Sequence, residues 1–453
     1  IVIENGSSMA CTFIAIAANY TSCPLNPSYT KEEFKFYYND LSVKAVIIEE
    51  NKSIEARAAA EELHIEVINL KRKTEFNTIN LDINADVKNK NKYLDEAKQD
   101  DIAMILHTSG TTSRPKMVPL SQKNLLASAR NISNTLNLNE HDKCLNIMPM
   151  FHIHGLIAAI LAPIYKSGTI ITPSGFDALK FFKWLNDFKP TWYTAVPTMH
   201  QAILARAPRN TDIIKNNQLK FIRSSSASLP STVMENLENT FNTCVIESYG
   251  MTEATHQMTS NPLPPNKRKA GSVGIAAGPE VALLLKNKIL HNIKDNQNIT
   301  GQIIIKGENV TDGYINNPEA NSESFVDDWF LTGDEGVFDN DGYLKITGRL
   351  KEIINRGGEK ISPKEIDEIL MEHKSIQQAV AFSVPHEKLG EDLYAAVILK
   401  ENEEISENNI KDYCQKRLTK FKIPRKILIV EEIPKGATGK LQRIGLHKKL
   451  GIK

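Results

Sequence analysis

The chain of 453 residues lacks several features that mark whole classes of protein. It has five cysteines, none of them in a C-x-x-C pair. An odd number without such pairs argues against a disulfide framework or a zinc site and favours a reducing compartment. The apolar stretch at residues 9–18 is too short to cross a bilayer and lacks the flanks of a signal peptide. The sequence therefore predicts no secreted scaffold, zinc protein or membrane-spanning protein.

An excess of charge is absent as well. Lysine and arginine number 55 against 54 aspartates and glutamates, a net charge of +1. The two signs are interspersed, so neither nucleic acid nor an anionic membrane is an expected partner. The sequence opens in a strand-like segment and ends without S-K-L. We therefore expect missing N-terminal residues, a cytoplasmic or peroxisomal location, and a monomer or weak homodimer.

The first part of the chain alternates helix-like segments (8–20, 53–64) with β-branched runs (44–50, 65–70), which is typical of parallel α/β layers. The polar residues 71–98 predict a surface loop. From about residue 280, short apolar runs between Gly, Asn and Asp turns predict a β-rich subdomain. Length suggests two to three domains at about 150 residues each. We predict an α/β fold with a large N-terminal domain at 1–348.

A compact α+β C-terminal domain is expected at 349–453, with a hinge near 349–351. Ser362, Pro363 and Glu365 predict a helix that starts with a capping box. An amphipathic pattern at 406–421 predicts a second helix. The sequence shows neither an internal repeat nor a low-complexity linker between the two domains. The boundary is therefore placed where the short strand-like runs give way to an α+β pattern.

One loop carries most of the local chemical signal. Small hydroxyl residues surround a glycine between residues 108 and 116, and backbone N–H groups in such a loop can close around phosphate oxygens. Lys116 adds a positive charge. The loop is no Walker motif, because no lysine is followed by Ser or Thr at a helix start. Phosphate binding and a polar surface loop both remain open from this segment alone. The residues concerned are Thr108, Ser109, Gly110, Thr111, Thr112 and Lys116.

Six segments in order resemble the adenylate-forming superfamily of acyl-CoA synthetases, luciferases and peptide synthetase adenylation domains. They are HTSGTTSRPK (107–116), MPMFHIHG (148–155), ESYGMTEA (247–254), LTGDEG (331–336), GRLKEIINRGGEKISPKEID (348–367) and PKGATGKLQR (434–443). The resemblance spans most of the chain. It implies the adenylate-forming enzyme fold with a mobile C-terminal domain. It also implies that the chain uses ATP, Mg²⁺ and coenzyme A.

The resemblance also assigns roles to single residues. The 108–116 loop would embrace the β- and γ-phosphates. Lys440 would bridge the acid carboxylate and the α-phosphate, and Lys351 would sit at the hinge. The remaining nucleotide, metal and CoA positions are Tyr249 at adenine, Ser248 and Gly250 as further nucleotide-binding residues beside it, Thr252 at the α-phosphate, Glu253 at magnesium, Asp334 and Arg349 at ribose, and Gly357, Gly358 and Glu359 along the pantetheine tunnel.

These residue types suit the chemistry. Attack of a carboxylate on the α-phosphorus brings negative charges together, and Lys440 with magnesium lowers that repulsion in a dry cleft. A carboxylate such as Glu253 suits a hard cation. Because Met117 stands where many relatives have glycine, we expect restricted backbone freedom at the end of the phosphate loop.

The acid pocket of this family is built near three further segments of this chain. They place hydrogen-bonding groups at His152, Ser226 and His256, where a fatty-acid ligase would need small apolar residues. If residues 252–256 are helical, Thr252 and His256 share a face. His154 is expected to be structural, because in an extended segment it points away from His152. Thr252, His152 and Lys440 are the candidate catalytic residues.

The pocket segments closely resemble the oxalate–CoA ligase branch, which implies that oxalate, ATP and CoA give oxalyl-CoA, AMP and diphosphate. Malonate is a rival, although Ser248 stands where malonyl-CoA ligases carry arginine. Medium-chain or aromatic acids are a second rival. A luciferase-like oxygenase and an inactive nucleotide-binding protein are alternatives of another class, and activity assays separate all of these.

Overall fold

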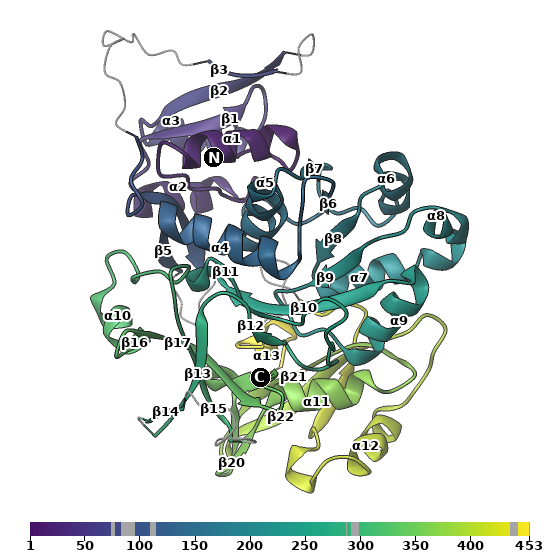
Figure 1. The fold of residues 1–453 in the computed structure, drawn as a ribbon. Helices are drawn as coiled ribbons and strands as arrows, with labels where there is room; N and C mark the ends of the chain where they lie inside the picture. Colours follow the sequence, from purple (N-terminus) through teal and green to yellow (C-terminus); the bar gives the residue numbers. More distant parts are fainter. Residues whose placement is uncertain are drawn as a thin grey trace.

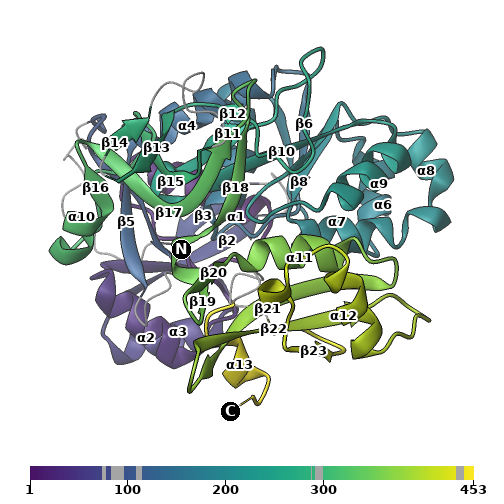
Figure 2. The same ribbon diagram turned by 90° about the horizontal axis from the view of Figure 1, so that it is seen from below.

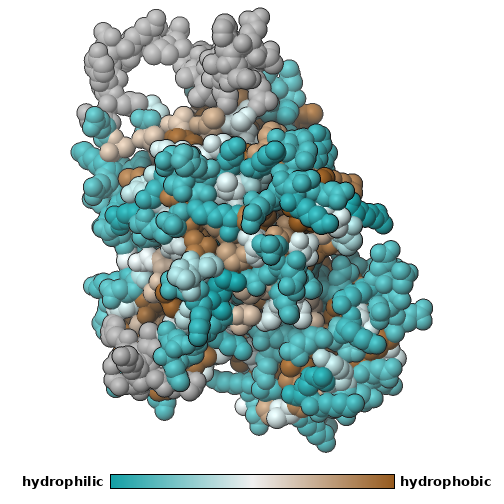
Figure 3. Space-filling model, turned by 45° about the vertical axis from the view of Figure 1, so that its right-hand side comes forward, coloured by the Kyte–Doolittle hydropathy of each residue, from teal (hydrophilic) through white to brown (hydrophobic). Residues whose placement is uncertain are grey.

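A computed structural model describes residues 1–73, 78–82, 96–108, 115–286, 288–290, 299–434 and 443–452. Figure 1 shows the N-terminal elements at the top, the central sheet and its helices below them, and the C-terminal elements at the bottom. Among the described residues, no helix combines the length and the apolar character needed to cross a bilayer. Hydrophilic side chains cover most of the face in Figure 3, with hydrophobic ones scattered between them.

The first layer is a small sheet in the order β1-β2-β3, with β1 parallel to β2 and β3 antiparallel. Helices α2 and α3 share a hydrophobic core with β1. The surface-loop prediction for 71–98 is wrong at its start, because β2 reaches Lys73 and β3 follows; residues 83–95 lie outside the described ones. The elements are α1 (Ser7–Ala17), α2 (Lys31–Asp40), β1 (Ala45–Glu49), α3 (Ile54–Glu62), β2 (Glu66–Lys73) and β3 (Thr78–Asp82).

The central sheet has seven strands in the order β12-β11-β10-β9-β8-β6-β7. The strands β7, β6, β8, β9 and β10 are parallel to one another. At the other edge, β11 is antiparallel to β10 and β12 is antiparallel to β11. The strands are β6 (Lys143–Asn146), β7 (Thr169–Ile171), β8 (Trp192–Ala195), β9 (Phe221–Ser224), β10 (Cys244–Met251), β11 (His256–Ser260) and β12 (Ile275–Ala276).

Both faces of this sheet are buried by helices. Alternate residues enter different cores: Trp192 and Phe221 join one with α4 and η1, whereas Tyr193 and Ile222 join another with α6, α7 and α9. The covering elements are α4 (Gln122–Thr135), η1 (His154–Leu161), α5 (Ala162–Tyr165), α6 (Phe181–Phe188), α7 (Pro197–Leu204), η2 (Ala207–Arg209), α8 (Thr211–Lys215) and α9 (Ser231–Phe241). In such sheets, ligands bind beyond the carboxyl ends of the parallel strands.

The β-rich subdomain predicted after residue 280 is present as an antiparallel sheet in the order β14-β13-β15-β17-β16, with β18 beside β17. A separate hairpin, β4 with β5, lies near α4 in the chain. The elements are β4 (Ile102–Thr108), β5 (Lys116–Ser121), β13 (Glu280–Leu285), β14 (Lys288–Leu290), β15 (Gly301–Lys306), α10 (Pro318–Ser324), β16 (Phe325–Val326), β17 (Trp329–Phe338) and β18 (Leu344–Arg349).

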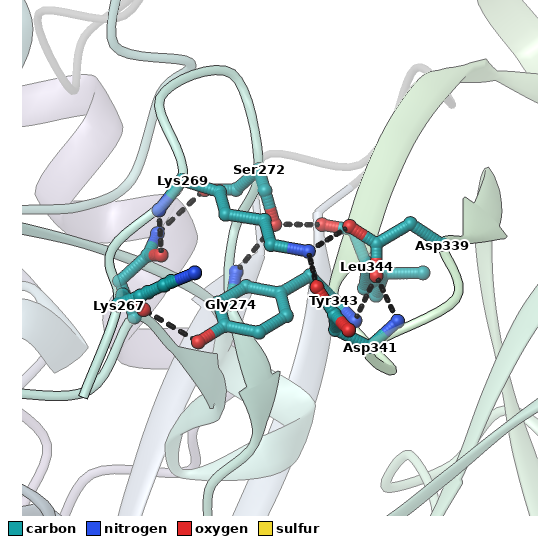
Figure 4. Close-up of polar contacts among 9 residues, drawn as sticks. Lys267, Lys269, Ser272, Gly274, Asp339, Asp341, Tyr343 and Leu344 are labelled. Atoms are coloured by element: carbon teal, nitrogen blue, oxygen red, sulfur yellow. Dashed lines mark hydrogen bonds and ion pairs between the residues drawn. The ribbon is translucent and has the colours of Figure 1, made fainter.

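A polar cluster fastens the loop that follows β11 to the turn between β17 and β18 (Figure 4). The Lys269 ammonium lies 2.6 Å from the carboxylates of both Asp339 and Asp341, and 4.3 Å from the centre of the Tyr343 ring. The Tyr343 hydroxyl in turn donates to the carbonyl oxygen of Lys267 at 2.5 Å. The cluster therefore ties the β-rich sheet to the loop that leaves the central sheet after β11.

The C-terminal part has its own sheet, in the order β20-β19-β22-β21 with β23 beside β22, and its own hydrophobic core. Figure 2 shows α11 between these strands and the larger N-terminal part. The elements are η4 (Leu350–Glu352), β19 (Ile354–Arg356), β20 (Glu359–Ile361), α11 (Pro363–Met371), β21 (Ile376–His386), β22 (Gly390–Leu399), α12 (Glu407–Gln415), η5 (Lys420–Lys422), β23 (Lys426–Ile429) and α13 (Leu446–Lys449). The domain boundary at 349–351 stays a prediction.

Helix α11 begins where the sequence predicts, but the capping box is wrong. The Ser362 hydroxyl donates to the carbonyl oxygen of Thr347 at 2.5 Å and makes no cap hydrogen bond. The Glu365 carboxylate instead pairs with Lys422 at 2.7 Å. A contact across the expected hinge has replaced the local one, which the spacing of the residues could not indicate.

Candidate active site

The candidate site is organised by the β10–β11 hairpin. The chain leaves β10 at Met251, makes one 3-10 turn at η3 (Thr252–Ala254) and enters β11 at His256. The helical alternative for 252–256 is therefore wrong. The turn is tight: a Cβ on Gly250 would lie 1.6 Å from the carbonyl oxygen of His256. Thr255 and His256 both have positive φ, 48° and 96°, a backbone strain that is concentrated at functional sites.

The residues predicted to bind adenine and ribose lie together. The Tyr249 hydroxyl donates to Oδ2 of Asp334 at 2.6 Å. Arg349, the direct neighbour of Asp334 on β18, donates to both carboxylate oxygens, at 2.7 and 3.3 Å. The nearby Asp334 carboxylate raises the pKa of the Arg349 guanidinium. This buried carboxylate can accept hydrogen bonds from sugar hydroxyls, as predicted.

A second charged group surrounds Glu253. The Tyr314 hydroxyl donates to its Oε1 at 2.9 Å, and the Lys116 ammonium lies 4.4 Å from the centre of the Tyr314 ring. Burial raises the pKa of the Glu253 carboxyl, while Lys116 and Arg349 oppose that shift. Burial also lowers the pKa of the Lys116 ammonium, and the positive charge of Lys351 lowers it further. Sequence reasoning did not find Tyr314, which follows Glu253 by 61 residues.

These residues fit a magnesium ion. The candidate donor is a buried carboxylate whose ionisation is disfavoured by burial, and a hard divalent cation favours the ionised form. Among the described residues, no three His, Cys, Asp or Glu side chains gather as a metal cluster. One carboxylate is still an adequate anchor, because magnesium takes its other ligands from phosphate oxygens and water. When bound, the ion supplies positive charge beside the phosphates.

The two ends of the predicted phosphate loop face each other, since Thr108 and Lys116 are cross-strand partners in the β4–β5 hairpin. Met117 lies inside β5 with its side chain buried, so a strand accommodates the side chain that replaces glycine. The predicted phosphate residues between the strands, and the predicted catalytic lysine, lie outside the described residues: Ser109, Gly110, Thr111, Thr112 and Lys440.

The predicted acid-binding residues Ser226 and His256 meet around His154. The His154 and His256 rings are stacked, with centres 4.8 Å apart and planes at 21°. Nδ1 of His154 lies 3.0 Å from the Ser226 hydroxyl. The prediction that His154 is structural assumed that its segment is extended, and that assumption is wrong. His154 opens the π-helical η1, which turns its ring into this cluster.

A buried arginine lies behind His154. Nη1 of Arg223 is 3.3 Å from Nε2 of His154, and Nη2 donates to the Gln257 side-chain oxygen at 3.2 Å. The Thr194 hydroxyl lies 2.6 Å from the same His154 nitrogen. Burial lowers the pKa of the Arg223 guanidinium to about 9, so it remains charged at neutral pH. The sequence signal that could have indicated Arg223 is a charged residue directly after the apolar pair Phe221 and Ile222, in the strand β9.

Two other predicted residues lie on segments that adjoin this cluster in the chain or in the sheet. His152 lies in the turn before η1, and its ring is 4.5 Å from that of Phe151. Ser248 is buried on β10, and its carbonyl oxygen accepts a hydrogen bond from the Ser225 hydroxyl at 2.9 Å. The strand of the nucleotide-binding candidates Ser248 and Tyr249 is therefore hydrogen-bonded to the residue directly before Ser226.

The predicted CoA loop is the tight turn between β19 and β20. Gly357 and Gly358 have φ of 60° and 95°, as the two central residues of a type I′ hairpin turn require. The Gly357 amide donates to the Leu389 carbonyl oxygen at 2.9 Å. Glu359 opens β20 and is exposed. The roles of these residues, like those of the other site residues, stay predictions.

Comparison with known proteins agrees with this geometry. The family described as AMP-binding enzyme matches residues 1–315, and the AMP-binding enzyme C-terminal domain matches residues 365–440. An oxalate–CoA ligase from Arabidopsis thaliana is 42% identical over 98% of this chain and 86% of the relative. One from Saccharomyces cerevisiae is 39% identical over 98% of this chain and 85% of the relative.

A solved structure shares the fold. The ATP-bound crystal structure of MatB from Rhodopseudomonas palustris superimposes with a TM-score of 0.87 at 27% identity, covering 99% of this chain and 87% of that one. The family matches, the shared fold and the clustered motif residues agree on one class of chemistry. The chain therefore belongs to the AMP-binding, adenylate-forming enzyme family and is an AMP-forming acyl-CoA synthetase.

Proposed function

We propose that this enzyme activates oxalate, forming oxalyl-adenylate from ATP and then oxalyl-CoA with release of AMP. In the first half-reaction an oxalate carboxylate oxygen attacks the α-phosphorus and diphosphate leaves. In the second, the CoA thiol attacks the acyl carbon, AMP leaves and the thiol proton passes to the medium. ATP and CoA are substrates, and Glu253 would hold the magnesium ion.

The observation that carries the choice of acid is the polar lining around His154. A pocket for an alkyl chain needs apolar walls, whereas Ser226, His154 and His256 present hydrogen-bonding groups. The second carboxylate of a small dicarboxylic acid can accept hydrogen bonds from such groups, whereas an alkyl chain cannot. The names of the two oxalate–CoA ligase relatives support the same choice.

A pyrophosphate-release assay over oxalate, malonate, succinate, hexanoate and coumarate tests the proposal. We expect oxalate to give the highest kcat/KM and malonate at least tenfold less, about 1.4 kcal/mol of discrimination at the transition state. Running the panel without oxygen separates ligase from oxygenase chemistry. Best turnover of hexanoate would overturn the assignment of the pocket, and release with no acid would show an inactive or uncoupled protein.

Malonate is the second candidate, and one residue weighs against it. Malonyl-CoA ligases carry an arginine at the position of Ser248. Here Ser248 is buried on β10, so the hairpin side of the pocket lacks that cation. The variant Ser248→Arg is expected to lower oxalate use and raise the malonate-to-oxalate ratio. An unchanged ratio would remove this residue from the argument.

Between the two half-reactions we propose a rotation of the C-terminal domain at Lys351. Lys440 and the Gly357–Glu359 loop belong to that domain, and one orientation cannot present both to the same site. In this structure the Ser362 hydroxyl and the Lys364 ammonium donate to β18 carbonyl oxygens at 2.5 and 2.8 Å. Rotation would break these contacts. Lys351→Pro should slow thioester formation more than adenylation. If the substitution slowed both half-reactions by the same factor, the hinge assignment would be contradicted.

The location we propose is the cytoplasm or the peroxisome, and the assembly a monomer or weak homodimer. Light scattering across a concentration series checks the assembly, since a weak dimer dissociates on dilution. Fractionation of cells that express the full-length protein checks the location.

A further inference from the structure

The acid-binding side of the site contains a buried positive charge without a carboxylate partner. Arg223 has no solvent exposure, and its described hydrogen-bond partners are the neutral groups of His154, Thr194 and Gln257. Its Nε has no hydrogen-bond partner among the described residues. Buried charges in proteins are normally paired, because desolvation disfavours them strongly. An unpaired guanidinium therefore points to a counter-charge that arrives with a ligand.

Arg223 also fixes the direction of the hydrogen bonds around it. Arginine can only donate, so the His154 nitrogen that faces it, Nε2, must accept. The Thr194 hydroxyl oxygen accepts from Nη1 of Arg223 at 3.5 Å, which leaves its own hydrogen free to point at the same His154 nitrogen, 2.6 Å away. The proton of the neutral ring then lies on Nδ1, which donates to the Ser226 hydroxyl oxygen at 3.0 Å. That hydroxyl is left to donate its own hydrogen elsewhere.

Ser226 is held in an unusual conformation for that task. It is half-buried, and its φ of 72° lies in the left-handed region that favours glycine. A non-glycine residue there is strained, and such strain is retained where the surrounding structure requires it. The loop thus presents the Ser226 hydroxyl at the edge of the cluster, one imidazole ring away from the Arg223 charge.

We propose that Arg223 is the specificity-determining positioning residue of the acid site: it holds His154 in the Nδ1-protonated form that orients Ser226, and its uncompensated charge selects acids with a second negative carboxylate. The inference rests on the proposed function for the identity of the acid. Arg223 itself lies behind His154, so it acts through His154 and Ser226 and by its field.

The test compares oxalate with oxamate, which has nearly the same shape but an uncharged amide in place of one carboxylate. We expect the wild-type enzyme to prefer oxalate at least 100-fold in kcat/KM. Arg223→Met should reduce that preference at least tenfold, through the KM for oxalate, while the KM for ATP stays the same. Arg223→Lys should keep most of it. Arg206→Met is the matched control: Arg206 is half-buried, and among the described residues its side chain donates to the Ala202 carbonyl oxygen on the preceding helix, α7.

A second pair of variants tests the hydrogen-bond direction and does not depend on Arg223→Met folding. His154→Asn places an amide N–H near the position of Nδ1, where it can donate to Ser226. His154→Gln places one near Nε2, facing the donors of Arg223. We expect the asparagine variant to keep oxalate turnover within about fivefold and the glutamine variant to lose at least 20-fold more. Equal losses would overturn the assigned tautomer.

The outcomes separate the inference from the proposed function. If the wild-type enzyme ignores oxalate but activates another dicarboxylate, the proposed acid is wrong, and that acid with its half-amide replaces the oxalate–oxamate pair. If oxalate is used and a folded Arg223→Met keeps the wild-type preference over oxamate, the inference is wrong and the proposed function stands. Thermal unfolding midpoints establish which variants are folded.

Discussion

The nucleotide-binding half of the site, around Asp334, and the acid-binding half, around His154, differ in how their charged groups are paired. In the nucleotide half, Asp334 is paired with Arg349, so the pair is electrically balanced without a ligand. In the acid half, Arg223 is surrounded by neutral groups. The first arrangement suits a substrate that brings its own cation, as ATP does with magnesium. The second leaves a positive charge for the substrate to balance. We therefore propose that the nucleotide half serves the chemistry that the whole family shares and that the acid half decides which acid enters.

The largest effect is expected from Lys440→Ala, which removes the cation predicted to serve both halves at once. Acyl-adenylate formation should fall roughly 10²–10³-fold, the usual effect of deleting one stabilising donor at a developing negative charge. Thioester formation from supplied acyl-adenylate should change little. A rapid-quench assay measures both steps, with the exposed Lys448→Ala as control. Undiminished adenylation would mean that a group other than Lys440 bridges the acid carboxylate and the α-phosphate.

Asp334→Asn should damage the nucleotide half alone. The change removes the charge that Arg349 and the Tyr249 hydroxyl bind. Because hydrogen bonds to charged groups contribute about 1.5–3 kcal/mol, kcat/KM for ATP should fall roughly 10²-fold. The oxalate-to-malonate preference should remain. Asp341→Asn, in the Lys269 cluster away from the site, is the control. A changed acid preference would show that the halves are not separable.

His256→Ala is the reciprocal change in the acid half. It removes the ring that stacks on His154, and kcat/KM for oxalate should fall about 30-fold, near the middle of the range for a hydrogen bond to a charged group. ATP affinity, measured by calorimetry, should stay within about twofold. Matched losses for oxalate and ATP would make His256 a folding residue and would weaken the contrast between the halves.

The smallest effect concerns Glu247, a buried acid on β10 that contrasts with Arg223. A carboxyl can relieve its burial by taking up a proton, and burial raises the pKa of Glu247 to about 7. The folded state therefore binds this proton more tightly than the unfolded state. Its contribution to stability is complete below pH 4.5 and disappears as pH rises through 7.

Between pH 6 and pH 8 this loss amounts to about 1 kcal/mol. Urea unfolding at both pH values measures it, and Glu247→Gln should remove that share of the pH dependence. The exposed Glu235→Gln, on α9, should not. If the free energy of unfolding of the Glu247→Gln variant changed with pH as much as that of the wild type, other titratable groups would be responsible. Glu247 would then offer no contrast to Arg223.

Much of the nucleotide half could be predicted from the sequence, because its residues stand in short ordered motifs. The motifs point to Tyr249, Asp334 and Arg349, and in the structure both Tyr249 and Arg349 donate to the Asp334 carboxylate. Here local pattern and tertiary structure agree.

The acid half was predicted only in part, because its contacts join segments far apart in the chain. His154 was set aside on the premise of an extended segment, but η1 turns it inward. Arg223 stands in an apolar strand, and only the folded sheet brings it to His154, 69 residues away. The capping box at Ser362 failed for the same reason, since a carbonyl oxygen of β18 captured its hydroxyl. Rules based on neighbouring residues cannot say whether a side chain makes a local hydrogen bond or one with a residue far away in the chain.

The most direct test of the central claim is a single turnover with ATP labelled at the α-phosphate, magnesium and oxalate, without CoA. Quenching within the first turnover should yield labelled oxalyl-AMP together with diphosphate, and later addition of CoA should convert it to AMP and oxalyl-CoA. Labelled ADP, or no labelled product while another acid forms its adenylate, would contradict the claim.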